Sequence, residues 1–182
     1  MRIRRESSLL LLVDLQARLA PAISGHERVT RRSVALLDAA RLLDVPVLAS
    51  EHCPGNIGTT IEPIAQRLRP GELVGKTHFS CTDEPGLAER LTAARRAQVI
   101  VCGMEAHVCV MQTALGLAAM GLEVYVAADA CGSRRDEDRD AAYARMAADG
   151  LRIATTEMAM FEWMGRADVP PFRELLKVVK GL

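Results

Sequence analysis

The chain has 182 residues, of which 49% are apolar and 25% are charged. This length and balance favour one soluble globular domain spanning residues 1–182 and exclude a disordered chain. Lys and Arg together number 23, as do Asp and Glu, so the formal net charge is zero. A neutral chain with few aromatic residues argues against nucleic acid as a partner.

Cysteine usage and apolar run lengths indicate the compartment. The five cysteines are odd in number and form no C-x-x-C pair, which argues against a disulfide framework or a zinc ribbon. Free thiols suit a reducing compartment. The first apolar run, residues 9–13, stops at Asp14 and is too short for a secretory signal or a membrane helix. We therefore predict a cytoplasmic protein without a membrane partner.

Short apolar runs alternate with stretches of helical periodicity along the chain. In chain order we predict a strand at 9–13, a helix at 26–43, a strand at 46–50, a loop at 53–58, a strand at 72–74, a helix at 84–97, a strand at 98–103, a helix at 106–120, a strand at 123–127, a helix at 136–149, a strand at 151–155, and helices near 157–164 and 171–180. This alternation is typical of βαβ units, so we predict an α/β fold whose parallel sheet has helices on both faces.

Ligands of such sheets bind at the carboxyl ends of the strands. Three chemically useful side chains follow predicted strands, namely Asp14, Lys76 and Cys109. A helix N-terminus and a neighbouring ammonium would both lower the pKa of the Cys109 thiol. A buried carboxylate at Asp14 could accept the thiol proton and later return it to a leaving group. The three residues therefore predict a nucleophilic site at one edge of the sheet.

Each of these residues also has a structural interpretation. A cysteine in an apolar helix is commonly a small buried hydrophobe, Asp14 can stabilise the turn after its strand, and Lys76 can be a solvated surface residue. The strand position of Cys102 indicates a buried structural thiol. The remaining cysteines fall in predicted loops and have no assigned role: Cys53, Cys81 and Cys131.

Several common ligand motifs are absent or imperfect. Three close His–Cys pairs, at 52–53, 78–81 and 107–109, suggest a zinc site. Their spacings, however, match no common zinc signature. The segment 71–77 approaches a phosphate-binding loop but has three residues between its glycines instead of four. No dinucleotide-binding fingerprint follows the first strand.

Three segments together resemble a known family. They are 12–16 (Leu-Val-Asp-Leu-Gln), 76–80 (Lys-Thr-His-Phe-Ser) and 103–110 (Gly-Met-Glu-Ala-His-Val-Cys-Val). They are similar, in order and in interval, to the signature segments of the isochorismatase-like cysteine hydrolases. Segments 129–134 and 155–157 add to a similarity that spans nearly the whole chain. The closest resemblance is to the isochorismatase-domain-containing, YcaC-like branch.

The resemblance implies a three-layer α/β/α sandwich with a six-stranded, mainly parallel, Rossmann-like sheet. It implies a catalytic triad of Asp14, Lys76 and Cys109, and a homo-oligomer. A non-proline cis peptide is expected between Met104 and Glu105. The backbone N–H groups of Glu105 and Cys109 would then form an oxyanion hole.

Two departures refine the expected chemistry. Nicotinamidases of this superfamily carry an Asp-x-His metal motif after the second strand, where this chain reads Ser50-Glu51-His52. We therefore expect no metal cofactor and no nicotinamidase activity. True isochorismatases cleave an enol ether without a thiol nucleophile, so the retention of Cys109 favours acyl chemistry.

The resulting hypothesis is a hydrolase that cleaves a small amide or related C–N substrate through a Cys109 thioacyl intermediate. Asp14 would act as general base and acid, and Lys76 as its charge partner. The predicted pocket walls are Gln16, His52, Phe79 and His107. Two alternatives remain open: an isochorismate-type vinyl-ether hydrolase, and a non-catalytic thiol-reactive or binding protein on the same fold.

Overall fold

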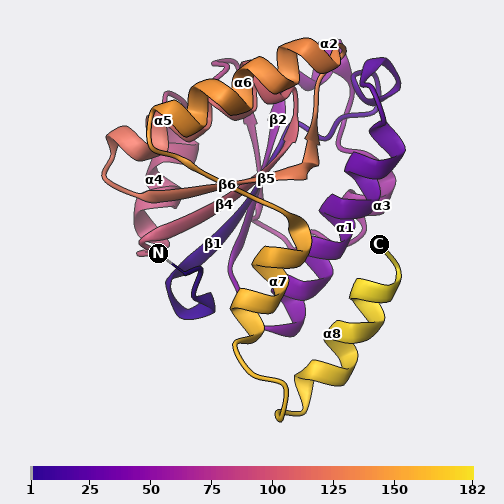
Figure 1. The fold of residues 1–182 in the computed structure, drawn as a ribbon. Coiled ribbons are helices and arrows are strands. Elements are labelled where there is room, and N and C mark those ends of the chain that lie inside the picture. Colours follow the sequence, from indigo (N-terminus) through magenta and orange to yellow (C-terminus); the bar gives the residue numbers. More distant parts are fainter. Residues whose placement is uncertain (1) are drawn as a thin grey trace.

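The computed structural model describes residues 2–182, which form a six-stranded sheet between two layers of helices (Figure 1). The strands are β1 (Ser8–Val13), β2 (Val47–His52), β3 (Leu73–Lys76), β4 (Gln98–Met104), β5 (Glu123–Gly132) and β6 (Arg152–Ala154). Their order is β3-β2-β1-β4-β5-β6, and every neighbouring pair is parallel. The predicted α/β/α fold with a parallel sheet is confirmed.

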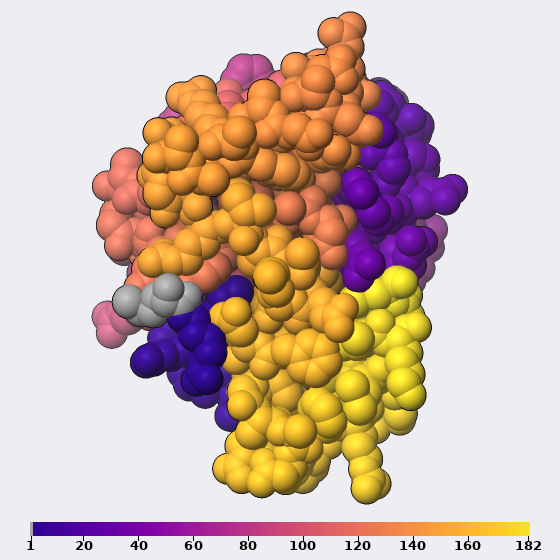
Figure 2. All heavy atoms as spheres, viewed as in Figure 1, coloured from indigo at the N-terminus to yellow at the C-terminus, as the bar shows by residue number. Residues whose placement is uncertain are grey.

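Helices cover both faces of this sheet. One layer holds α1 (His26–Leu42), α7 (Thr156–Met164) and α8 (Pro171–Lys180), and the other holds α4 (Pro85–Ala93), α5 (Met111–Ala119) and α6 (Asp136–Ala148) (Figure 1). Shorter elements join them: α2 (Pro54–Ile57), α3 (Glu62–Ala65), the 3₁₀ turns η1 (Arg5–Ser7) and η2 (Ala20–Ala22), and a π-helical turn, η3 (Ala106–Val110). In the space-filling view, the C-terminal helix lies beside the N-terminal third of the chain (Figure 2).

The centre of the sheet lies at β1, where the strand order reverses between β1 and β4. All six residues of β1 are buried, because the strand has a neighbour on each side and a helical layer on each face. Its apolar composition follows from this position. A reversal of strand order opens a crevice at the carboxyl ends of the adjoining strands. This edge is where the predicted site residues lie.

One strand is longer than the sequence pattern indicated. β5 continues to Gly132, five residues beyond the predicted end, with a register shift against β4 between Val101 and Gly103. Asp129 is polar but fits within the strand, because its Oδ1 accepts hydrogen bonds from the backbone N–H and the hydroxyl of Thr156. Cys131 is therefore a buried strand residue, and its predicted loop position was wrong.

Two further predictions need correction. The helix predicted over residues 106–120 begins as the π turn η3 and becomes α-helical only at Met111. The loop predicted over 53–58 contains the one-turn helix α2, with Pro54 in its first position. Within residues 2–182, no helix has the length and apolar character needed to cross a bilayer.

Candidate active site

Three strand ends deliver the predicted site residues to one edge of the sheet. Asp14 follows β1 in a left-handed conformation (φ +51°), which turns the chain sharply as it leaves the sheet. Lys76 is the last residue of β3, and Cys109 lies in the π turn that follows β4. The side chains of Asp14 and Lys76 are completely buried, and Cys109 is 6% exposed.

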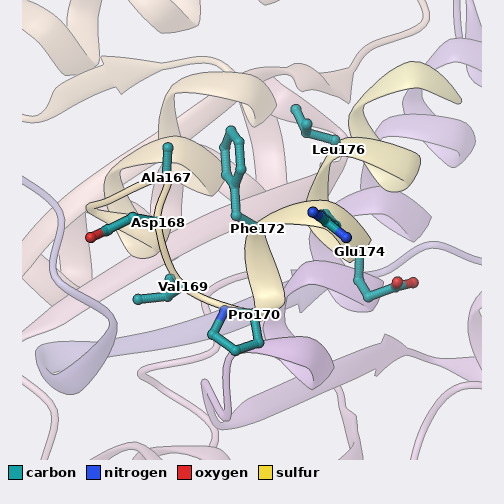
Figure 3. Close-up of a pocket in the computed structure, with 8 residues that line it drawn as sticks. Ala167, Asp168, Val169, Pro170, Phe172, Glu174 and Leu176 are labelled. Atoms are coloured by element: carbon teal, nitrogen blue, oxygen red, sulfur yellow. The ribbon is translucent and has the colours of Figure 1, made fainter.

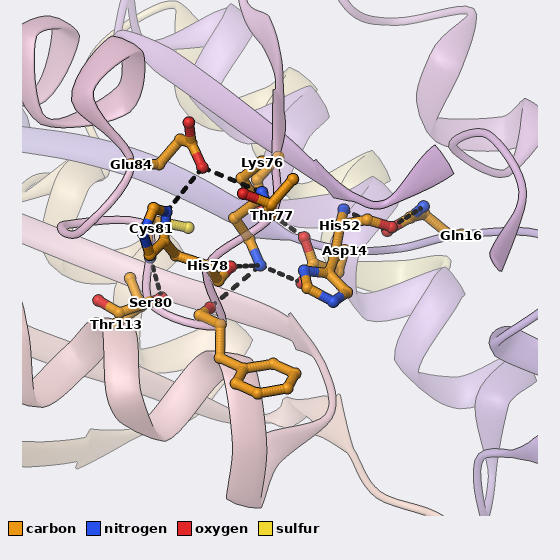
Figure 4. Close-up of polar contacts among 12 residues, drawn as sticks. Asp14, Gln16, His52, Lys76, Thr77, His78, Ser80, Cys81, Glu84 and Thr113 are labelled. Atoms are coloured by element: carbon orange, nitrogen blue, oxygen red, sulfur yellow. Dashed lines mark hydrogen bonds and ion pairs between the residues drawn. The ribbon is translucent and has the colours of Figure 1, made fainter. Parts of the chain in front are cut away.

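Lys76 is surrounded by oxygen atoms (Figure 4). Its Nζ lies 2.7 Å from Asp14 Oδ2, and it donates hydrogen bonds to the backbone carbonyls of His78 (3.1 Å) and Phe79 (3.0 Å). Burial by itself lowers the pKa of Lys76, but the interaction with the Asp14 carboxylate outweighs this effect, so the pKa is raised overall. The ammonium is therefore a fixed positive charge at neutral pH.

The two carboxylate oxygens of Asp14 have different environments. Oδ1 accepts a 2.6 Å hydrogen bond from the Ser50 hydroxyl. Oδ2 is buried and pairs with the Lys76 charge, yet it receives no hydrogen bond of suitable geometry from residues 2–182. A buried acceptor with spare capacity beside a thiol is well placed to take a proton.

The Cys109 thiol interacts with both Asp14 and Lys76. Burial is the largest influence on its pKa and raises it well above the usual range; the charge of Asp14 raises it further, and that of Lys76 only partly opposes this. The expected lowering of this pKa was wrong, because the sequence pattern does not reveal how deeply the thiol is buried. Cys109 therefore rests as a neutral thiol, and a nucleophilic role would require a base to remove its proton.

The backbone before Cys109 has an unusual course. The peptide bond between Met104 and Glu105 is cis, as the resemblance implied, and the carbonyl of Glu105 accepts hydrogen bonds from the N–H groups of Val108 (3.1 Å) and Val110 (3.2 Å). Gly103 precedes this bond with φ +137°, and a Cβ there would overlap the carbonyl of Val13. Glycine is thus required at Gly103, where β4 lies against Val13 of β1.

The end of β5 supports this segment through two side-chain contacts. Glu105 Oε2 accepts hydrogen bonds from the backbone N–H and the Nε of Arg134, each at 3.0 Å. His107 Nδ1 lies 2.9 Å from the Ser133 hydroxyl. Ser133 and Arg134 were not predicted as site residues, although both lie within the segment 129–134 that contributes to the family resemblance.

Of the predicted pocket residues, Gln16 is buried and holds a loop in place, whereas Phe79 is exposed to solvent. Gln16 is fully buried, and its Oε1 accepts a hydrogen bond from the backbone N–H of His52 (2.8 Å). Its Nε2 donates to the carbonyls of His52 (3.0 Å) and Gly58 (2.5 Å). It therefore fixes the loop after β2. The His52 ring stacks on that of Phe79, with centroids 5.2 Å apart, and Phe79 is 51% exposed. His52, the last residue of β2, and Phe79, in the loop after β3, together form an aromatic ledge.

The remaining thiols differ in their relation to the site. Cys81 is buried and lies against the hydroxyls of Ser50 and Thr113, and burial raises its pKa. Burial raises the pKa of Cys102 to about 12.

Among residues 2–182, no three His, Cys, Asp or Glu side chains are grouped as metal ligands.

A separate hollow of about 750 Å³ lies near the C-terminus, along the turn between α7 and α8 (Figure 3). Its lining includes Asp168, Val169, Pro170 and Phe172. None of the predicted site residues contributes to it, so it is distinct from the sheet edge that holds Asp14, Lys76 and Cys109.

Comparisons with known proteins agree with this architecture. The mouse isochorismatase domain-containing protein 2A is 40% identical over 181 residues, which cover 98% of this chain and 85% of the mouse protein. The structure of the MAR1 ribonuclease from Caenorhabditis elegans superposes with a TM-score of 0.93 at 34% identity, covering 99% of this chain and 93% of the other. The Escherichia coli YcaC structure, described as an octameric hydrolase of unknown specificity, superposes with a TM-score of 0.88 at 20% identity, covering 99% and 97%.

The sheet order, the strand-end side chains and these similarities lead to one assignment. The isochorismatase domain family matches residues 8–158, which include every residue of the predicted site. The chain therefore belongs to the isochorismatase family.

Proposed function

We propose that this protein is a cysteine hydrolase that cleaves a small amide or a related C–N substrate. The observation that carries the proposal is the environment of Cys109. A neutral, nearly buried thiol lies beside a carboxylate oxygen of Asp14 that has no hydrogen-bond donor, and the Lys76 ammonium lies against the same carboxylate. A thiol, a base and a fixed positive charge are the groups that acyl transfer to cysteine requires.

In the proposed first step, Asp14 Oδ2 takes the thiol proton while Sγ attacks the substrate carbonyl carbon. The carbonyl π electrons move to oxygen, where the backbone N–H groups of Glu105 and Cys109 would stabilise the oxyanion. The intermediate then collapses, the C–N bond breaks, and Asp14 passes its proton to the departing nitrogen. The products of this half-reaction are a free amine or ammonia and a Cys109 thioester.

The second half-reaction consumes water. Asp14 removes a proton from a water molecule as its oxygen attacks the thioester carbonyl, and the C–S bond then breaks. The proton on Asp14 returns to the departing sulfur, which restores the Cys109 thiol and the Asp14 carboxylate. Lys76 stays charged throughout, since its ammonium is paired with Asp14 and donates hydrogen bonds to the carbonyls of His78 and Phe79.

The surroundings favour a small-molecule substrate. We assign the aromatic ledge of His52 and Phe79, together with His107, to the walls that contact substrate. Gln16 holds His52 in place through hydrogen bonds to its backbone. No step of this proposal uses a metal or an organic cofactor.

Five free thiols suit a reducing compartment, so we propose a cytoplasmic location.

We also propose that the protein forms a homo-oligomer. Met158 and Phe161 of α7 are 54% and 38% exposed, and the Phe161 ring lies 6.4 Å from that of Phe172 on α8. Exposed apolar groups that cluster on one face mark interfaces. We expect light scattering to give a mass above that of one chain, and Phe161→Glu to reduce it. Met120→Glu, at an exposed position on the opposite helical layer, is the matched control. A wild-type protein that is monomeric at every concentration would contradict this proposal.

The activity is tested by an ammonia-release screen over small amides, with wild type and Cys109→Ala in parallel. We expect release by the wild type only. Equal release by both proteins would overturn the thioacyl mechanism, and ether cleavage that survives Cys109→Ala would identify the isochorismate-type alternative. RNA is included because the C. elegans relative is named a ribonuclease; our proposal predicts that it is not cleaved. Alkylation of Cys109 without turnover of any substrate would favour the non-catalytic alternative.

A further inference from the structure

We propose that Ser50 is a positioning residue that holds the Asp14 carboxylate with Oδ2 directed at Lys76 and Cys109. This inference rests on the proposed role of Asp14 as the base that receives the thiol proton. In the sequence, Ser50 is notable only because it replaces the Asp of the Asp-x-His metal-binding motif. The structure gives the same position a direct contact with the proposed base.

The contact between Ser50 and Asp14 has two parts. The backbone N–H of Asp14 donates to the carbonyl of Ser50 at 3.2 Å, and the hydroxyl of Ser50 donates to Asp14 Oδ1 at 2.6 Å. The parallel register of β1 and β2, which pairs Val13 with Ser50, creates this proximity. Ser50 is 2% exposed and Asp14 is completely buried, so water does not compete for the hydrogen bond.

The ion pair with Lys76 does not by itself fix how the carboxylate is turned. An ammonium acts nearly as a point charge, and the two oxygens of a carboxylate can exchange by rotation about the last side-chain bond. The Ser50 hydroxyl is directional and engages only Oδ1. Oδ2 therefore remains the oxygen with spare acceptor capacity, on the side of the Lys76 ammonium.

Cys81 supplies a reason for the orientation of the hydroxyl itself. Burial raises the pKa of the Cys81 thiol, which lies against the Ser50 side chain, so this thiol keeps its proton. The Ser50 hydroxyl has a single hydrogen, and the short contact to Asp14 uses it. A protonated Cys81 thiol is only a weak acceptor, so it does not compete with Asp14 for this hydrogen.

The test compares Ser50→Ala and Ser50→Thr, with Ser33→Ala as the control. Ser33 is also a fully buried serine, but its hydroxyl bonds the carbonyl of Ala130, away from the site. With an amide from the screen above, we expect Ser50→Ala to lower kcat by about 10- to 100-fold, since a misdirected base loses its alignment. KM should stay within about twofold of the wild-type value, and Ser50→Thr should restore kcat, because substrate binding does not use this hydroxyl. Ser33→Ala should leave both constants unchanged.

Crystal structures of the two Ser50 variants give a readout that needs no activity. We expect the Asp14 carboxylate to be rotated or present in two orientations in Ser50→Ala, and to keep its native orientation in Ser50→Thr. An unrotated carboxylate in Ser50→Ala, or a kcat in that variant equal to that of Ser33→Ala, would overturn the inference. If Cys109→Ala hydrolyses the amide as fast as wild type, the proposed function fails, and the orientation of Asp14 in the Ser50→Ala crystal still decides the role of Ser50.

Discussion

Asp14 and Lys76 form a 2.7 Å ion pair in which neither side chain retains any exposure to solvent. Removing two charges from water is unfavourable, and their attraction compensates only when both are present. The pair is thus stable only as a unit, which makes each side chain dependent on the other. It places an acidic and a basic side chain together beside a thiol whose own pKa is raised by burial.

Loss of one partner of this pair should destabilise the fold. We expect Lys76→Met to lower the free energy of unfolding by about 3–5 kcal/mol, because the Asp14 carboxylate is left buried without a compensating charge. The double variant Asp14→Asn/Lys76→Met should recover much of that loss while remaining inactive. Urea unfolding followed by circular dichroism measures both effects.

The matched control for this prediction is an exposed ion pair. Arg166 and Asp168 lie in the turn between α7 and α8, and both side chains are 67% exposed. Asp168→Asn should leave the urea midpoint unchanged, because surface ion pairs contribute little. A Lys76→Met protein as stable as wild type would show that the buried pair is not as the structure describes it.

The reactivity of Cys109 should follow the charges around it. Its pKa is raised first by burial and then by Asp14, while Lys76 lowers it. The pH midpoint for alkylation of Cys109 by iodoacetamide should therefore lie above that of cysteine in an unstructured peptide. Asp14→Asn removes a negative charge beside the thiol, so it should move the midpoint to lower pH. Mass spectrometry of the Cys109 peptide measures the rate at each pH, and Asp168→Asn serves as the control.

A wild-type midpoint below that of the peptide would contradict the neutral resting thiol and favour a preformed thiolate. An unchanged midpoint in Asp14→Asn would show that the carboxylate does not act on Cys109 electrostatically.

Alkaline pH should destabilise the protein through its buried thiols. The folded state raises the pKa of Cys81, Cys102, Cys109 and Cys131 above 9.0, the ordinary thiol value. Above pH 9 the unfolded chain loses protons that the folded chain retains, so stability is present below this pH and is lost as the pH rises. Each thiol contributes a slope that approaches about 1.4 kcal/mol per pH unit once it is fully ionised in the unfolded chain. Urea unfolding at pH 8 to 10 under reducing conditions should show the decline, and Cys102→Ala should make it shallower. Equal stability across this range would contradict the burial of these thiols.

Gly103 should tolerate no side chain. An added Cβ would overlap the Val13 carbonyl, in the strand that carries Asp14, and φ is +137°. We expect Gly103→Ala to prevent folding or to abolish activity with a large loss of thermal stability. Gly121 also has positive φ (+83°) but has no neighbouring atom within 4 Å of an added Cβ. Gly121→Ala should therefore cost only about 1–2 kcal/mol, the penalty of the left-handed conformation alone. Equal melting temperatures for the two variants would contradict the close approach of β4 to β1.

The sequence predicted those features that depend on local pattern. The apolar run of β1 and the β-branched run of β4 identified central strands, and the strand-end rule selected Asp14 and Lys76 without knowledge of their contact. Cys109 emerged in the same way. The shared location of these three residues was predictable because a parallel sheet brings the carboxyl ends of its strands to one edge whatever the details of the loops.

Features that depend on register and depth were not visible in the sequence. The contact of Ser50 with Asp14 requires the pairing of β1 with β2, and the support of His107 by Ser133 requires β5 to continue beyond its predicted end. The sign of the Cys109 pKa shift was predicted wrongly because helix position and charge are readable from sequence, whereas burial is not. The π turn η3 likewise differs from an ordinary helix by a hydrogen-bond pattern that composition does not encode.

Acylation of Cys109 during turnover can be detected directly by rapid acid quench followed by mass spectrometry. With the best amide from the screen, we predict that the Cys109 peptide gains the mass of the substrate acyl group in the wild type, and that Cys109→Ala shows neither the adduct nor ammonia release. Steady turnover with an unmodified Cys109 peptide, together with undiminished ammonia release by Cys109→Ala, would exclude a thioacyl intermediate on Cys109.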